Sequence, residues 1–182
     1  MSISKIFEKD IDVKLLSEDN FTANISENWS IGQTANGGYS MALIAKACSK
    51  ALSHKDPLVL SANYIDRVEF GSADIQITKI ASTKSTSTAH VSLKQNGILK
   101  IFCTVTFTDF SKMKGLNNNL RLEPKFDPYE NCIQVPYKEG FNPKLDKNLE
   151  KKYCLDSLWW KNPSEENKAC LLYTSDAADD GL

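Results

Sequence analysis

Apolar and polar positions recur at regular spacing over most of the first half of the chain. In residues 21–26 (FTANIS), Phe21, Ala23 and Ile25 share one face, which is the period-two pattern of a half-buried strand. A turn-rich stretch follows from Trp29 to Gly38. The spacing then changes from that of a strand to that of a helix.

Residues 38–53 are predicted to form a helix that is buried on most of its sides. Its polar positions make only a narrow stripe, at Lys46, Ser49, Lys50 and Ser53. Apolar residues, many of them small, cover the rest of the circumference, which is typical of a helix packed closely against a sheet. The segment 54–57 ends in proline, which cannot continue a helix.

Four strand candidates follow this helix, and turn residues separate them. Their apolar faces are, in order, Leu58, Leu60, Ala62 and Tyr64; Ala73, Ile75 and Ile77; Ala89, Val91 and Leu93; and Leu99, Ile101, Cys103, Val105 and Phe107. Asn96-Gly97, between the last two, favours a type I′ hairpin. The pattern predicts an α+β fold in which an antiparallel sheet of about five strands wraps one central helix. It disfavours a parallel nucleotide-binding sheet, because strands and helices do not alternate.

The chain changes character after residue 110. Asparagine, glycine and proline punctuate residues 111–140, which indicates a connector. Residues 149–160 (LEKKYCLDSLWW) have the pattern of a second domain that begins but is not completed. Residues 170–182 (CLLYTSDAADDGL) resemble the translation of a sequencing-library adapter, and we expect them to be a non-native tail on a truncated gene. The alternative is an acidic natural terminus.

Composition narrows the functional classes. The formal net charge is −1, which gives no basic surface for nucleic acid. The sequence has neither a run of apolar residues long enough for a membrane helix nor a secretory signal, so we expect a cytoplasmic protein. The five cysteines are scattered without a Cys-x-x-Cys pair, and we expect thiols in a reducing compartment, no metal site and no cofactor.

Trp29 to Ala47 (WSIGQTANGGYSMALIAKA) resembles the glycine-containing helix entry of thioesterase-like hotdog proteins. The later segments DPLVLSANYIDRVEFG, LKQNG and ILKIFCTVTF support the resemblance. Together they look like the N-terminal half of a double-hotdog acyl-CoA thioesterase, over about residues 21–109 and more weakly after residue 142.

The resemblance implies a domain plan and a ligand. It implies a hotdog domain over 1–110, a linker over 111–141 and an incomplete start of a second hotdog over 142–169, before the tail of 170–182. In this family an acyl-CoA substrate lies between two hotdogs, which are either in one chain or in a homodimer. The acid and base residues of some double-hotdog enzymes belong to the second hotdog, and no position here matches them.

Asn36, Gly37 and Gly38 are the candidate catalytic residues, as an oxyanion hole. Hydrolysis of a thioester passes through an oxyanion, which backbone N–H groups at a helix N-terminus can stabilise. Glycine lets the backbone approach a carbonyl group without a Cβ. The alternative is structural: Asn36 only caps the helix and the glycines only permit close packing. The residues leave these two readings equal, and the family resemblance favours the first.

Other side chains near this entry are candidates for substrate contact. Trp29, Gln33, Tyr39 and Tyr64 are predicted to line an acyl tunnel or its mouth, although core packing is the commoner fate of an aromatic residue. Lys46 and Lys50 are candidates for contact with CoA phosphates, or simply a solvated helix stripe.

A general base is harder to assign. Asp66 and Glu69 are the nearest carboxylates in the pattern, but Arg67 beside Asp66 favours a surface ion pair. His90 falls on the polar face of its strand, where we expect it to be solvated. Cys48, on the buried helix, is expected to pack rather than attack a substrate.

Three functions remain open from the sequence. The first is hydrolysis of an acyl-CoA to the free acid and CoA. The second is a non-catalytic hotdog half that binds an acyl thioester or supports its partner. The third, a hotdog hydratase or dehydratase, requires a well-placed histidine and carboxylate, and the chain has only two histidines.

Overall fold

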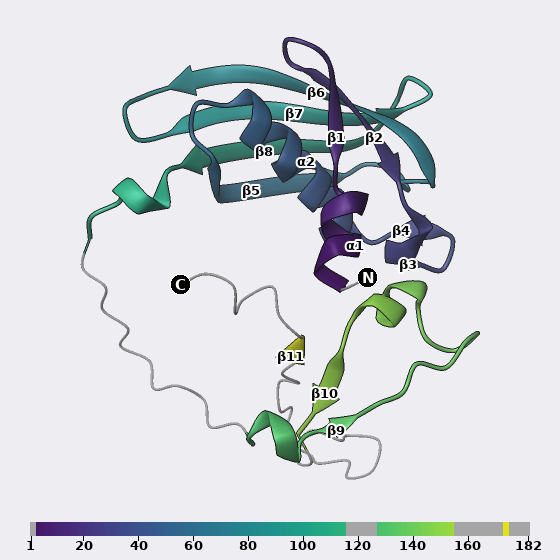
Figure 1. The fold of residues 1–182 in the computed structure, drawn as a ribbon. Coiled ribbons are helices and arrows are strands. Elements are labelled where there is room, and N and C mark those ends of the chain that lie inside the picture. Colours follow the sequence, from purple (N-terminus) through teal and green to yellow (C-terminus); the bar gives the residue numbers. More distant parts are fainter. Residues whose placement is uncertain (1–2, 116–126, 155–172, 175–182) are drawn as a thin grey trace. The chain divides into compact units, whose positions relative to one another are not determined.

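The computed structural model describes residues 3–115, 127–154 and 173–174. The chain divides into two compact units, residues 1–115 and 116–182. Figure 1 shows the elements of both units.

Unit 1 contains one long helix and a large sheet. Its elements are α1 (Ile3–Asp10), β1 (Val13–Ser17), β2 (Asn20–Ile25), η1 (Glu27–Trp29), β3 (Ser30–Ile31), β4 (Thr34–Ala35), α2 (Gly37–Ala51), β5 (Asp56–Tyr64), β6 (Gly71–Ser82), β7 (Ser87–Gln95), β8 (Ile98–Thr108) and η2 (Phe110–Lys112). β1, β2 and β5–β8 form one six-stranded sheet in the order β1-β2-β6-β7-β8-β5, and every neighbouring pair is antiparallel.

The sheet curves around α2, as Figure 1 shows, and the α+β hotdog fold is confirmed. The helix side chains Leu43, Ile44, Ala47 and Cys48 are all 0% exposed. Alternate residues of β6, β7 and β8 face this helix, and the buried ones include the predicted Ala73, Ile75, Ile77, Ala89, Val91, Leu93, Ile101, Cys103, Val105 and Phe107. The period-two pattern therefore identified the core faces of β6, β7 and β8. It was wrong for β5, where none of the predicted face residues Leu58, Leu60, Ala62 and Tyr64 is buried.

The sheet has six strands rather than about five, because β1 pairs with β2 along one edge. In β1 only Val13 is buried, so the strand has no apolar alternation by which it could be recognised. The preceding helix α1 was also not predicted. The predicted bounds of the central helix also shift, since α2 begins at Gly37 and Leu52 already has extended backbone angles, φ −89° and ψ 158°.

The turn between β7 and β8 follows the sequence expectation. Asn96 and Gly97 both have positive φ, at 50° and 78°. Positive φ at both central residues is what a type I′ turn requires, so the predicted hairpin is confirmed.

At the far edge of the sheet, β5 is the least buried of the long strands. Leu58, Val59 and Tyr64 are 42%, 54% and 53% exposed. Only β8 pairs with β5 among the described residues, so the other side of this strand has no partner there.

Unit 2 contains a small antiparallel sheet in the order β11-β10-β9. Its elements are η3 (Tyr129–Asn131), β9 (Ile133–Gln134), η4 (Lys144–Asn148), β10 (Lys151–Tyr153) and β11 (Tyr173–Thr174). The assignments of a linker over 111–141 and of a second hotdog start over 142–169 stay predictions, and both ranges lie partly outside the described residues. The predicted tail over 170–182 lies outside them except for β11. No helix among the described residues is long and apolar enough to span a membrane.

Candidate functional site

The amino end of α2 is the region to which the sequence assigned the site, and Asn36 is its cap. The Asn36 side-chain oxygen accepts a hydrogen bond from the Tyr39 backbone N–H at 3.2 Å. The Asn36 backbone N–H donates to Trp29 O at 2.8 Å, which fixes the entry of the helix against η1. Asn36 thus satisfies one of the backbone donors that a helix N-terminus leaves open.

Gly37 is required by the close approach of Tyr64 from β5. The Tyr64 hydroxyl donates to Gly37 O at 3.0 Å. A Cβ placed on Gly37 would lie 3.0 Å from that hydroxyl oxygen and 3.1 Å from the ring carbon that bears it. The predicted site residues Gly37 and Tyr64 are therefore in direct contact, and burial raises the pKa of the Tyr64 phenol.

Gly38 has a different environment. It is exposed, and a Cβ there would meet only the cap oxygen of Asn36, at 3.1 Å. Within the described part of the chain, the backbone N–H groups of Gly37 and Gly38 have no hydrogen-bond acceptor. These two donors, at the positive end of the helix dipole, are what an anionic oxygen would require.

Trp29 and Tyr39 are buried, at 6% and 3% exposed. Their polar groups form hydrogen bonds within the protein. The Trp29 indole N–H donates to Asp10 Oδ2 at 3.0 Å. The Tyr39 hydroxyl donates to Asp10 O at 2.7 Å and accepts from the Ser26 N–H at 3.1 Å. Burial raises the pKa of the Tyr39 phenol. The two rings stack with 6.1 Å between centroids, so they join α1 to the entry of α2.

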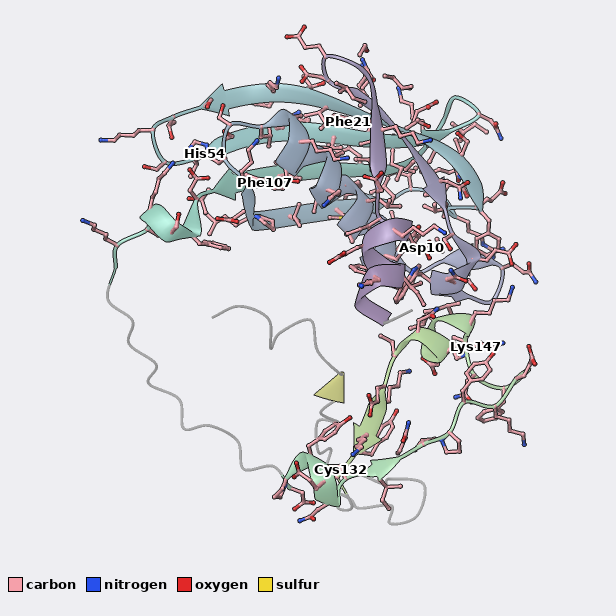
Figure 2. The ribbon with its side chains drawn as sticks, in the orientation of Figure 1. Asp10, Phe21, His54, Phe107, Cys132 and Lys147 are labelled. Carbon is pink, nitrogen blue, oxygen red and sulfur yellow. The ribbon has the colours of Figure 1, made fainter. Side chains whose placement is uncertain are left out.

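Asp10 is an organising residue that the sequence reasoning missed. Its carboxylate also accepts from the Asn28 side-chain amide at 2.8 Å. Figure 2 labels it at the end of α1. Helix α1 has only eight residues, which is too short for its apolar spacing to predict a helix. The role of Asp10 was therefore not predicted either. Gln33, by contrast, lies exposed in the turn between β3 and β4, where Gly32 has a φ of 61°.

Asp66 forms an ion pair, although not the predicted one. Its Oδ2 lies 2.6 Å from Lys100 Nζ, while Arg67 donates only its backbone N–H, at 2.7 Å, to Oδ1. The Lys100 side chain is 7% exposed. The hydrogen bond from Lys100 is the main cause that lowers the pKa of Asp66, so this carboxylate is a poor proton acceptor.

Glu69 is part of a loop held by Gln95. The Gln95 side chain accepts from Glu69 N at 2.9 Å and donates to Glu69 O at 2.9 Å and to Ser72 O at 3.3 Å. Gln95 is 4% exposed. Its side chain therefore helps to fix the loop before β6.

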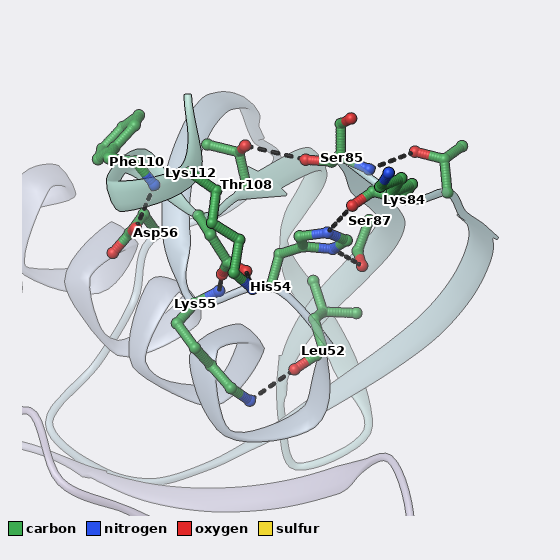
Figure 3. A network of polar contacts seen from close by, with 12 residues as sticks. Leu52, His54, Lys55, Asp56, Lys84, Ser85, Ser87, Thr108, Phe110 and Lys112 are labelled. Atoms are coloured by element: carbon green, nitrogen blue, oxygen red, sulfur yellow. Dashed lines mark hydrogen bonds and ion pairs between the residues drawn. The ribbon is translucent and has the colours of Figure 1, made fainter. Parts of the chain in front are cut away.

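The two histidines lie away from this helix entry. His90 is exposed on β7, on the face opposite to the buried residues, beside the Phe102 ring. His54 is 6% exposed and follows the other end of α2. As Figure 3 shows, its Nδ1 lies 2.7 Å from Ser87 Oγ and its Nε2 lies 3.3 Å from Lys84 O. Because a carbonyl only accepts, Nε2 donates to Lys84 O, and in the neutral ring Nδ1 then accepts from the Ser87 hydroxyl.

Lys50 and Cys48 have structural roles. Lys50 Nζ donates to Asp12 Oδ1 at 2.9 Å and to Val13 O at 2.6 Å, which ties α2 to β1. Cys48 is fully buried, and this burial raises the pKa of its thiol to about 12. A thiol in that state is not a nucleophile, as expected.

The structure therefore gathers Asn36, Gly37, Gly38 and Tyr64 at one helix end. Trp29 and Tyr39 lie behind them, and Gln33 lies on a neighbouring turn. In the described part of the chain, the hydrogen bonds of residues 36–39 include no carboxylate and no imidazole side chain.

Comparisons with known proteins bear on the fold of unit 1. Residues 25–108 match the family model for the acyl-CoA thioesterase N-terminal domain. The thioesterase-like protein TwmA from Talaromyces wortmannii is 29% identical over 99 residues, which is 53% of this chain and 28% of the fungal protein.

Solved structures show the same fold at low identity. A proposed thioesterase II from Thermobifida fusca YX aligns with a TM-score of 0.77 and 17% identity, over 87% of this chain and 59% of the other. A conserved protein of unknown function with a hot dog fold from Alicyclobacillus acidocaldarius aligns with a TM-score of 0.71 and 13% identity, over 81% and 55%. The chain thus spans less than two thirds of the length of these relatives.

Proposed function

We propose that unit 1, in which residues 25–108 match the family model for the acyl-CoA thioesterase N-terminal domain, binds an acyl-CoA thioester and takes part in its hydrolysis. The reaction yields a free acid and CoA. The proposed site is the amino end of α2, with Asn36, Gly37 and Gly38 as its centre.

One observation carries the proposal. The helix entry presents the two N–H groups of Gly37 and Gly38, which have no acceptor in the described part of the chain. A thioester carbonyl oxygen seated there accepts hydrogen bonds that become stronger as it turns into an oxyanion. Gly37 and Gly38 have no side chains of their own that would block a ligand from reaching these two N–H groups.

The surrounding residues support this arrangement. Asn36 fixes the first turn through the Tyr39 N–H, and the Tyr64 hydroxyl holds the Gly37 carbonyl. Trp29 and Tyr39 support the site indirectly, because their hydrogen bonds to Asp10 hold α1 next to the amino end of α2. Tyr64, which is 53% exposed, and Gln33 are available to contact the acyl chain or the pantetheine arm.

The hydrolytic water needs a base, and we assign that base to a second hotdog. Asp66 is held by Lys100, and His54 and His90 lie away from residues 36–39. A second hotdog, from the same chain or from another copy, would bring its own side chains to this helix entry. The exposed edge strand β5, which follows α2 and carries Tyr64, is the side on which it would pair.

The test separates binding from chemistry. We expect the chain to bind a non-hydrolysable acyl-CoA thioether in calorimetry, and Gly38→Val to weaken that binding by about tenfold or more, since the valine branches cover the free N–H groups. Release of the CoA thiol from a set of acyl-CoAs measures hydrolysis in parallel. Asn36→Ala is expected to lower hydrolysis more than binding.

Gly115→Val is the matched control, because a Cβ on Gly115 meets no atom within 4 Å. It should leave both measurements unchanged. Wild-type protein that neither binds the thioether nor releases thiol would end the proposal, and so would an unchanged affinity in Gly38→Val.

A second candidate function rests on the same region. Since no carboxylate or imidazole side chain hydrogen-bonds residues 36–39 among the described residues, unit 1 also fits a non-catalytic half that binds an acyl thioester. Binding of the thioether without release of thiol, under conditions where the chain self-associates, would select this function. The same observation counts against a hydratase.

A further inference from the structure

Unit 2 brings two cysteines together that lie far apart in the sequence. Cys132 and Cys154 are both thiols, and their sulfur atoms are 3.6 Å apart. Cys132 directly precedes β9 and Cys154 directly follows β10. We propose that Cys132 and Cys154 form a dithiol modification site, which small-molecule disulfides of the glutathione type oxidise to an intramolecular disulfide.

The strand register supports this pairing. β9 and β10 are antiparallel, with Lys152 opposite Gln134 and Tyr153 opposite Ile133. The same register continued by one residue places Cys154 directly opposite Cys132. Directly opposed residues of antiparallel strands have Cα separations of about 4.5–5.5 Å, which lies within the range that a disulfide spans. Closure therefore needs the two sulfur atoms to approach by rotation of the side chains, with the strands already in place.

The two thiols differ in accessibility, which gives the order of the steps. Cys132 is 7% exposed, and its thiol lies near Asp127 O and Pro128 O, at 3.8 and 3.6 Å. Burial is the main cause that raises the pKa of Cys132. Cys154 is half-buried and is the thiol that a small disulfide reaches. Cys132 is then the second, resolving thiol.

The exchange balances in two steps. The Cys154 thiol loses its proton to solvent, and the thiolate attacks one sulfur of the small disulfide, whose S–S bond breaks to release one thiolate. The Cys132 thiol then loses its proton to solvent, and the thiolate attacks Cys154 Sγ in the mixed disulfide and releases the second small thiolate; the two small thiolates take up two protons from solvent. The two protein thiols are oxidised by two electrons, and the small disulfide is reduced to two thiols.

The other cysteines do not offer this geometry in the described residues. Cys48 and Cys103 are buried in unit 1, and their burial raises the pKa values of their thiols to about 12 and about 11. Cys170 lies outside the described residues. It is therefore the competitor that an experiment has to exclude.

Peptide mapping of the full chain tests the proposal. Trypsin places each of the five cysteines on its own peptide, with Cys132 in FDPYENCIQVPYK and Cys154 in YCLDSLWWK. After treatment with oxidised glutathione and alkylation of the remaining thiols, we expect most of the Cys132 peptide to be linked to the Cys154 peptide. The intact mass should fall by two hydrogen atoms, and dithiothreitol should restore it.

Substitutions provide the controls. Cys170→Ser should leave the linked peptide unchanged, whereas Cys132→Ser should leave Cys154 carrying glutathione as a stable mixed disulfide. That trapped adduct depends on the order of attack and does not depend on the stability of the variant's fold. Linkage of Cys132 or Cys154 mainly to Cys170, or alkylation of both after oxidation, would overturn the proposal. Oxidation in denaturant should give scrambled pairs.

Discussion

At the scale of single residues, Gly37 shows how a close approach, rather than a backbone angle, can require glycine. The Tyr64 ring lies where a Cβ would project, and its hydroxyl binds the Gly37 carbonyl. The sequence motif Asn36-Gly37-Gly38 indicated a special helix entry. It did not indicate that the first of its glycines accommodates an aromatic ring from a strand that comes 27 residues later.

We expect Gly37→Ala to destabilise unit 1 by about 1–2 kcal/mol, because the methyl group overlaps the Tyr64 ring. In a Tyr64→Ala background the same substitution should be neutral or stabilising, since alanine is the better helix former. Urea unfolding of the four proteins gives the coupling energy. If the two substitutions change the free energy of unfolding additively, the contact with Tyr64 is not the reason why residue 37 is glycine.

The ion pair of Asp66 with Lys100 predicts a pH dependence. The pKa of Asp66 in the folded protein is below its ordinary value of 3.8, so the pair stabilises the fold above that pH and its contribution is lost as the pH falls through the folded pKa. We expect Asp66→Asn to lower the urea midpoint at pH 7, and the difference from wild type to shrink towards pH 3. Lys100→Met should show the same trend, and a deficit that is equal at both pH values would contradict it.

At the scale of elements, the helices and strands that have a regular apolar spacing could be predicted from the sequence. Features that depend on contacts between distant segments could not. The central helix, four of the long strands and the Asn96-Gly97 turn could be predicted, because each has a complete apolar face or a required backbone conformation. α1 and β1 could not, since one is a short helix and the other buries only Val13. Of the candidate site, the helix entry was predicted, whereas the roles of Asp10 and Gln95 depend on contacts between segments distant in sequence.

In the loop at residues 65–70, both backbone groups of Glu69 are bonded by one side chain from another element. Gln95 satisfies both backbone groups of Glu69, so Gln95→Leu leaves a donor and an acceptor without their partner. We expect a loss of about 1–3 kcal/mol and faster hydrogen exchange in residues 65–72. Gln76→Leu, on the exposed face of β6, is the control. Unchanged exchange in the loop of Gln95→Leu would assign its stability to other contacts.

At the scale of the whole molecule, unit 1 has one long edge that is both apolar and without a partner in the described residues. Leu58, Val59 and Tyr64 of β5 and the following Ile65 are between 42% and 59% exposed. Exposed edge strands of this kind associate with other strands. The edge therefore fits the expectation that a hotdog pairs with a second hotdog.

We expect the chain to self-associate at micromolar concentration, with a weight-average mass that rises with concentration in sedimentation or light scattering. Val59→Lys places a charge on the edge and should shift the distribution towards monomer, whereas Gln76→Lys, on the exposed face of β6 between Asn20 of β2 and Ser92 of β7, should not. A wild-type chain that stays monomeric over the full range would contradict this.

The Tyr39 hydroxyl, which joins Asp10, Ser26 and α2, has a consequence for anyone who shortens this chain. Removal of residues 1–10 would leave a phenol and the indole of Trp29 facing water or an apolar gap, each without the acceptor it now has. The amino-terminal helix is thus integral to the fold although the family match begins only at residue 25. A minimal domain cut at that boundary would lose helix α1, which supports Trp29 and Tyr39 next to the proposed ligand site.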